Sequence, residues 1–227
     1  LQVEPWRDTA VGLRGPAVGE LMSAFVKTWR YIQRSGRVSQ CEHMAETPGL
    51  DVVGTAPSLR SKVRDRYRAL ARSAERSIQL TMAYFAPDDS LVDELTAAAG
   101  RGVKVQLMIP AKSDLPILTH AARSFYERLL RCGVEIYERE HVVLHAKTMV
   151  VDGQVSVIGS TNLDYRSIEY NLELSVVIRS PEFGEKMGLL FENDVRYSRR
   201  ICPEEWRRRP IRDRLGQWAV SRARYLL

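Results

Sequence analysis

The densest group of reactive residue types lies in one stretch, Leu144 to Asn162. It places Lys147 two residues after His145, and it continues through Asp152 to Ser160 and Asn162. In an extended strand, residues i and i+2 face the same side, so His145 and Lys147 share one face. An imidazole there can attack phosphorus or carry a proton, and the ammonium can neutralise a phosphate oxygen. The stretch therefore predicts chemistry on a phosphodiester.

The second half of this stretch is expected to complete the site. Asp152 and Gly153 are typical of a tight hairpin turn, which returns the next strand beside the first. Ser160 and Asn162 would then reach the phosphate and add hydrogen-bond donors where transition-state charge develops. Asp152 completes the predicted catalytic set of the motif, although its place before Gly153 favours a role in the turn and in an ion pair.

No metal or cofactor is predicted. His141 and His145 are four residues apart, a spacing that suits zinc ligands on a helix. The valines at 142, 143, 150 and 151 instead predict a strand, in which such residues lie ~13 Å apart. The three cysteines are far apart and form no C-x-x-C pair, which argues against a zinc ribbon or a disulfide framework.

The elements around the motif alternate between strands and helices from residue 58 onward. Such alternation predicts an α/β fold, with a mixed, mostly parallel sheet flanked by helices. The expected helices are Ser58–Arg76, Asp88–Ala99, Leu118–Arg131 and Pro181–Arg196, and the expected strands are Ser77–Ala83, Val103–Ile109, Val134–Tyr137, Val142–Val151, Val155–Ile158 and Leu172–Ile178. A further helix is expected over Pro16–Arg30, followed by a polar linker, Ser35–Pro57.

The beginning of the chain repeats a later part of it. Moving Asp8–Met22 forward by 165 positions aligns it with Glu173–Met187 without a gap, and six of fifteen residues are identical. Both segments read as a strand, a turn with proline at the first helical position, and a helix. The repeat predicts four regions: the tail of a preceding module (1–34), a linker (35–57), a complete catalytic module (58–198) and a basic tail (199–227).

The motif at His145, Lys147, Asp152 and Asn162 resembles the signature of the phospholipase D superfamily. Further segments resemble its bacterial cardiolipin synthase branch: Tyr84-Phe85-x-Pro87, Lys112-Ser113-Asp114, Arg123-Ser124-Phe125-Tyr126, Gly133-Val134-x-Ile136-Tyr137, Asn162-Leu163-Asp164-x-Arg166-Ser167 and Asn171-x-Glu173. Trp6-Arg7-Asp8-Thr9 resembles the segment just after the first catalytic motif in that branch. The chain therefore resembles the C-terminal half of such an enzyme, one complete lobe with the tail of another.

The resemblance also implies roles for two carboxylates. A carboxylate 28 residues after the motif histidine bonds its far nitrogen in the family, which implies that Glu173 orients His145. Through the repeat, Asp8 occupies the place of Glu173 in the preceding module. It would then orient that module's histidine, expected about twenty residues before Leu1 by the same spacing.

By resemblance, the reaction is phosphatidyl transfer through a phosphohistidine, joining two phosphatidylglycerols with release of glycerol. The family favours the other module's histidine as nucleophile and His145 as acid and base. The implied partners are the anionic lipid, the membrane surface and the upstream module, at the cytoplasmic face of a bacterial inner membrane, peripheral or anchored by an upstream segment. Nucleic acid is not an expected partner. Two alternatives stay open, a homodimeric nuclease or phosphodiesterase of the same superfamily and a non-catalytic lipid-binding fragment.

Charge is concentrated at the end of the chain. From Arg196 to Leu227, ten arginines face three acidic residues, a balance of +7 within a total of +6. Ile211, Leu215, Trp218, Ala219 and Leu226 fall mainly on one helical face of this segment. The pattern fits an interfacial helix on an anionic leaflet, and equally a helix packed on its own domain with Trp218 buried.

Overall fold

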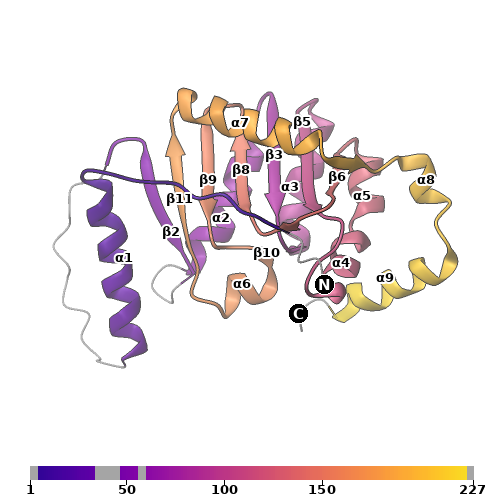
Figure 1. Cartoon of the computed structure of the whole chain (residues 1–227), viewed down its shortest axis with the longest axis horizontal. Helices are drawn as coiled ribbons and strands as arrows, with labels where there is room; N and C mark the ends of the chain where they lie inside the picture. The colour runs from indigo at the N-terminus through magenta and orange to yellow at the C-terminus, as the bar shows by residue number, and fades with distance from the viewer. Residues whose placement is uncertain (1–4, 34–46, 56–59, 224–227) are drawn as a thin grey trace.

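An eight-stranded mixed sheet forms the centre of the protein in a computed structural model, which describes residues 5–33, 47–55 and 60–223 (Figure 1). In spatial order its strands are β12 (Ser198–Arg200), β6 (Glu135–Arg139), β5 (Lys104–Pro110), β3 (Ser77–Met82), β8 (Lys147–Val151), β9 (Val155–Gly159), β11 (Leu174–Arg179) and β2 (Leu50–Gly54). β5 runs parallel to β3 and β6, whereas the other neighbours in this sheet are antiparallel. The predicted mixed α/β sheet is confirmed, but it is less parallel than expected because antiparallel pairs make up the half from β3 to β2.

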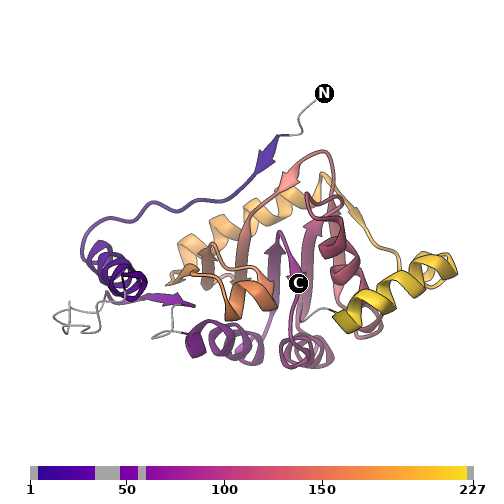
Figure 2. The same cartoon turned by 90° about the horizontal axis from the view of Figure 1, so that it is seen from below.

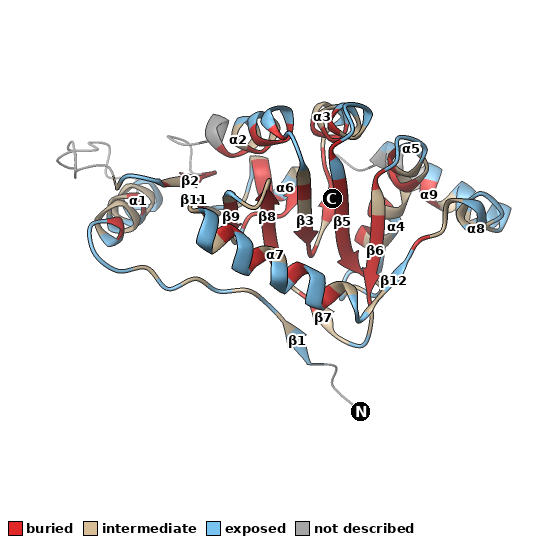
Figure 3. Ribbon diagram, turned by 90° about the horizontal axis from the view of Figure 1, so that it is seen from above, coloured by how far each residue is buried: buried red, intermediate tan, exposed pale blue. Residues whose placement is uncertain are grey.

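Helices cover both faces of this sheet, as predicted. α2 (Arg60–Ser73), α3 (Asp89–Gly100) and α5 (Tyr126–Arg131) lie on one face, and α7 (Pro181–Val195) crosses the other (Figure 3). The remaining helices are α1 (Ala17–Ile32), α4 (Pro116–Ser124), α6 (Tyr165–Glu169), α8 (Pro203–Arg207) and α9 (Ile211–Ala223). The larger core packs between the sheet and α2, α3 and α5, and two smaller clusters pack under α7. The sheet is therefore held rigidly from both sides.

Two predicted boundaries differ from the structure. The range predicted as a linker, 35–57, contains β2, which pairs with β11 from Leu50 to Gly54. Its apolar residues Leu50 and Val53 are buried, and this burial against the sheet edge makes the segment a strand. The helix expected over Leu118–Arg131 is divided into α4 and α5 at Phe125. Ser58, the first residue of the helix expected before the sheet, and residues 34–46 lie outside the described residues.

Two short parallel ladders bring distant parts of the chain together. β1 (Trp6–Arg7) pairs with β7 (Val143–Leu144), and β4 (Phe85–Ala86) pairs with β10 (Leu163–Asp164). Figure 2 shows the segment after β1 running along the molecule from β7 to α1. Val11 and Leu13 of this segment pack against the cluster under α7. The segment from β1 to Leu13, which lies in the range predicted as the tail of a preceding module, thus contacts the rest of the described chain at β7 and under α7.

Close backbone contacts explain two glycines near the motif. A Cβ atom on Gly159 would lie 2.3 Å from the carbonyl oxygen of Leu174, and one on Gly184 would lie 2.3 Å from that of Gly153. Both distances are far inside van der Waals contact, so neither position accepts a side chain without movement of the backbone. Gly159 therefore lets β9 approach β11 where the motif ends, and Gly184 seats α7 on the β8–β9 hairpin.

Candidate active site

His145 lies in a break between two strands rather than within one. β7 ends at Leu144 and β8 begins at Lys147, so the strand predicted over Val142–Val151 is interrupted at residues 145 and 146. The His145 side chain is 39% exposed, whereas Lys147 is buried. The Lys147 ammonium donates a hydrogen bond to the carbonyl oxygen of His145. The two residues are neighbours as predicted, with the imidazole open to solvent and the ammonium buried against the backbone of His145.

The carboxylate that reaches His145 is Asp8. Asp8 Oδ2 lies 2.8 Å from Nδ1 of His145, and the rings of Trp6 and His145 are 4.9 Å apart between centroids. The β1–β7 ladder produces this contact, since the His145 amide donates to the Arg7 carbonyl oxygen at 2.8 Å. The expectation that Glu173 occupies Nδ1 of His145, with Asp8 reserved for another histidine, is therefore corrected. Strand pairing across 137 positions, which local spacing cannot report, decides which carboxylate arrives.

Glu173 lies beyond the end of β9, one residue before β11. Its carboxylate accepts a hydrogen bond from the side-chain amide of Asn171 at 3.1 Å, and its backbone amide donates to the hydroxyl of Thr55 at 2.7 Å. Thr55 follows β2, so the edge strand that the sequence did not predict helps to fix this residue. Glu173 also contributes to the field at Lys147. It belongs to the same site without being the partner of His145.

Lys147 is the buried cation of the site. Burial lowers the pKa of its ammonium, because removal from water disfavours the charged form. The carboxylates of four residues oppose this effect through their negative charge: Asp8, Glu173, Asp114 and Asp164. These come from four separate segments of the chain. The site is therefore a buried cation surrounded by carboxylates, one of which also holds the exposed imidazole.

Two of these carboxylates were not predicted as site residues. Asp114 accepts hydrogen bonds from the Tyr84 hydroxyl at 2.7 and 3.0 Å. Burial raises the pKa of Asp114, but hydrogen bonds from Tyr84 and Ser113 outweigh it, and the net pKa is lowered. Burial raises the pKa of Asp164, whose carboxylate caps α6 through the amide and hydroxyl of Ser167. Both residues occur in segments that carry the family resemblance, and this resemblance could have identified them as site residues.

Ser160 and Asn162 reach the region of the site but are already engaged by protein groups. The Asn162 side-chain oxygen accepts from the Tyr84 amide at 3.2 Å, and Asn162 is buried. The Ser160 hydroxyl accepts from the Leu174 amide at 3.1 Å. These bonds attach the end of β9 to β4 and β11. Their role in holding a phosphate stays a prediction.

Asp152 stands at the far end of β8 from Lys147, ~16 Å away at the usual rise of a strand. Its backbone is left-handed, with φ of 56°, and Gly153 follows with φ of 67°. Its carboxylate accepts the backbone amides of Glu75, Arg76 and Ser77 at 2.7–3.0 Å. Burial raises the pKa of Asp152, but these hydrogen bonds outweigh burial, so that the net pKa is lowered. Its place in the catalytic set is corrected: Asp152 forms the hairpin turn and connects it to α2 and β3.

Within residues 5–33, 47–55 and 60–223, no group of three or more potential ligands could hold a metal ion. Across the same residues, no helix is both long enough and apolar enough to cross a bilayer.

Known proteins are similar to this chain over most of its length. A family model described as "Cardiolipin synthase, PLD-like domain" matches residues 67–195. The chain is 32% identical over 214 residues to the probable cardiolipin synthase YwiE of Bacillus subtilis, covering 92% of the chain and 43% of that protein. It is 33% identical over 225 residues to the cardiolipin synthase of Geobacillus kaustophilus, covering 96% and 44%. The chain thus spans less than half the length of these relatives.

Solved structures share the fold at low sequence identity. Nuc from Salmonella typhimurium, a phospholipase D family member, gives a TM-score of 0.58 at 22% identity, covering 67% of this chain and 97% of that one. Phosphatidylserine synthase from Haemophilus influenzae gives 0.59 at 12% identity, covering 81% and 49%. These likenesses support the arrangement of the sheet and helices described above.

Proposed function

Because the chain belongs to the cardiolipin synthase family of phospholipase D-like proteins, we propose that it supplies one half of the active site of a phosphatidyltransferase. The enzyme would join two phosphatidylglycerols and release glycerol. The observation that carries this proposal is the group formed by His145, Asp8 and Lys147. An exposed imidazole backed by a carboxylate, with an ammonium beside it, supplies the groups that phosphoryl transfer needs.

The His145–Asp8 contact suits an acid–base histidine. An Nδ1–H group that donates to Asp8 leaves Nε2 free to accept or deliver a proton. The carboxylate also stabilises the imidazolium that forms when Nε2 takes up a proton. The Lys147 ammonium lies at the backbone of His145 and would offset the negative charge of a phosphate bound at the ring. Asn162 and Ser160 would add donors to the phosphate oxygens.

The reaction needs a second histidine as nucleophile. Nε2 of that residue would attack phosphorus, and the bond from phosphorus to the glycerol oxygen would break. His145 would give its proton to the leaving oxygen. The hydroxyl of a second phosphatidylglycerol would then return a proton to His145 and attack phosphorus, which frees the first histidine. The chain's own residues would handle proton transfer and charge, with no metal in the scheme.

The second histidine would come from the preceding module of the same protein. The chain spans less than half the length of its relatives, and Asp8–Met22 repeats Glu173–Met187. In this repeat, Met22 of α1 corresponds to Met187 of α7. Met187 is buried between α7 and the sheet, whereas Met22 is 57% exposed. Phe25 and Trp29 are exposed on the same helix. We propose that this apolar face covers the sheet of the preceding module as α7 covers its own.

The repeat then suggests an exchange of carboxylates. Asp8 would belong to the tail of the preceding module, but it bonds the histidine of this one. Glu173 is its counterpart and lies in the site beside Lys147. By the same symmetry, Glu173 would orient the histidine of the preceding module.

The substrate assay tests this function directly. The whole protein is expected to convert radiolabelled phosphatidylglycerol into cardiolipin and glycerol, and to leave single-stranded DNA intact. The chain of 227 residues alone is expected to show little turnover, since it supplies one histidine of the pair. Cleavage of DNA without lipid transfer would instead support the homodimeric nuclease. Lipid binding without either activity would support the non-catalytic alternative.

We propose further that α9 holds the protein at an anionic membrane surface, at the cytoplasmic face of a bacterial inner membrane. α9 packs on α4, and its Gln217 is buried. Ile211, Leu215 and Trp218 are 71%, 62% and 60% exposed. Trp218 is therefore not buried in the domain, and the apolar face is available for lipid while arginines surround it. Ala219 and Leu226, expected on this face, lie outside what the structure describes for side chains.

Replacing Ile211, Leu215 and Trp218 together with serine is expected to weaken binding to phosphatidylglycerol vesicles by at least about tenfold, because each apolar side chain loses burial in lipid. Co-sedimentation at low and high salt measures the effect. The matched control is Leu189→Ser on α7, which removes an equally exposed leucine (65%). Equal vesicle binding by the triple variant and by Leu189→Ser would mean that α9 is only a packing helix.

A further inference from the structure

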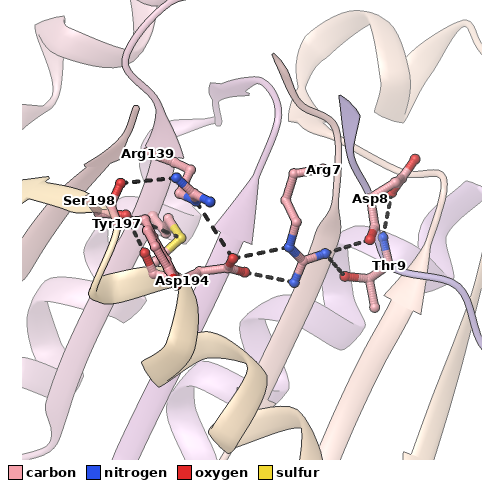
Figure 4. Close-up of polar contacts among 8 residues, drawn as sticks. Arg7, Asp8, Thr9, Arg139, Asp194, Tyr197 and Ser198 are labelled. Carbon is pink, nitrogen blue, oxygen red and sulfur yellow. Dashed lines mark hydrogen bonds and ion pairs between the residues drawn. The ribbon is translucent and has the colours of Figure 1, made fainter. Parts of the chain in front are cut away.

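Arg7 connects the short β1 strand to the end of α7. Its guanidinium donates to both carboxylate oxygens of Asp194, from Nε at 3.0 Å and from Nη2 at 2.7 Å (Figure 4). Such a bidentate pair fixes the direction as well as the distance of the two groups. The Asp194 side chain is 6% exposed and that of Arg7 is 22% exposed. The contact is therefore largely screened from water.

The same guanidinium also holds the backbone around Asp8. Its Nη1 donates to the Asp8 carbonyl oxygen and, at 3.0 Å, to the Thr9 hydroxyl. The Thr9 amide donates to Asp8 Oδ1 at 2.8 Å, which leaves Oδ2 directed at His145 Nδ1. Asp8 itself is half exposed, and β1 pairs with β7 over two residues only. Arg7 therefore adds a side-chain anchor to the short ladder that carries Asp8.

Asp194 is in turn fixed from the opposite side. Arg139 of β6 places Nε 3.6 Å from Asp194 Oδ1, and its Nη1 donates to the Tyr197 carbonyl oxygen at 3.0 Å. The Arg139 guanidinium also lies over the Tyr197 ring, 5.0 Å from its centroid. Ser198 donates to the Asp194 carbonyl oxygen at 2.7 Å. β6 and the end of α7 therefore form a rigid base for the Arg7 contact.

We propose that Arg139, Asp194 and Arg7 form a positioning network that holds Asp8 against His145. The chain of contacts runs from the sheet through α7 to β1, and from there to the imidazole. None of the three touches the imidazole or, in the proposed reaction, the phosphate, so they act through Asp8. The inference rests on the proposed role of His145, and it deepens that role by naming what fixes the ring.

The test reads the ring of His145 directly. In ¹⁵N-histidine-labelled protein, the neutral His145 ring is expected to carry its proton on Nδ1, where Asp8 accepts it. Arg7→Gln and Asp194→Asn are expected to move the Nδ1 and Nε2 resonances towards those of free imidazole. Asp8→Asn should cause the same change because it removes the accepting carboxylate. Asp51→Asn is the matched control, since Asp51 is also paired with two arginines, Arg66 and Arg179, at the other end of the sheet.

The outcomes separate the possibilities. If Arg7→Gln and Asp194→Asn both fold and leave the His145 resonances at their wild-type positions, the pair is ordinary structural contact and the proposal fails. A silent Asp8→Asn variant would overturn it as well. If Asp194→Asn does not fold, the Arg7→Gln variant still tests the proposal, because Asp194 keeps its contact with Arg139 in that variant. The resonances do not depend on turnover, so failure of the proposed lipid chemistry would appear in the substrate assay alone.

Discussion

Replacing His145 with glutamine in the whole protein is expected to abolish cardiolipin formation, with turnover lowered by at least about 10²–10⁴-fold. Glutamine keeps a polar side chain at the position but cannot take up and release a proton near neutral pH. The proposed leaving glycerol would then depart as an alkoxide, a poor leaving group. Production of cardiolipin from radiolabelled phosphatidylglycerol, monitored under single-turnover conditions, measures the effect.

His120→Gln is the matched control, because His120 is an exposed histidine on α4 and has no part in the proposed site. It is expected to keep wild-type turnover. Thermal unfolding of both variants shows whether the fold survives the change. Persistent turnover by His145→Gln would remove this residue from the chemistry, and with it the assignment of the exposed imidazole as acid and base.

Much of the fold could be predicted because its signals are local. The central strands are segments of five to seven residues rich in apolar and β-forming residues, and α3 and α7 follow capping residues, Asp88 and Ser180. β2, β4 and β10 escaped prediction for the opposite reason. They are short, and long-range pairing supplies much of what makes them strands. The segment containing β2 was predicted as a linker because its composition is polar.

In the candidate site, too, local contacts could be predicted and long-range contacts could not. His145 and Lys147 are two residues apart, so their proximity followed from sequence spacing. The carboxylate that contacts His145 could not be predicted in the same way. The repeat supplies two equivalent carboxylates, Asp8 and Glu173, and spacing favours Glu173 because it is nearer in sequence. The β1–β7 pairing selects Asp8 instead, through backbone bonds of β1 and the Arg7–Asp194 contact. Neither contact leaves a pattern in the residues around His145.

Asp8→Asn is the variant that distinguishes the two pairings most sharply. In the whole protein it is expected to slow the chemical step by about 10²–10³-fold, a loss typical of removing one preorganised electrostatic partner. The amide keeps the size of the side chain but stabilises the imidazolium less, and it can present a donor to Nδ1 in place of an acceptor. Pre-steady-state formation of cardiolipin measures the step without interference from lipid exchange.

Asp93→Asn serves as control, because Asp93 is an exposed aspartate of α3 paired with Arg128, outside the site. Glu173→Gln, compared in the same assay, is also expected to slow transfer if Glu173 orients the histidine of the preceding module. The ring of His145 separates the two cases: Asp8→Asn should change its ¹⁵N resonances and Glu173→Gln should not. The reverse result would restore the pairing suggested by sequence spacing, and it would mean that β1 leaves β7 when both modules are present.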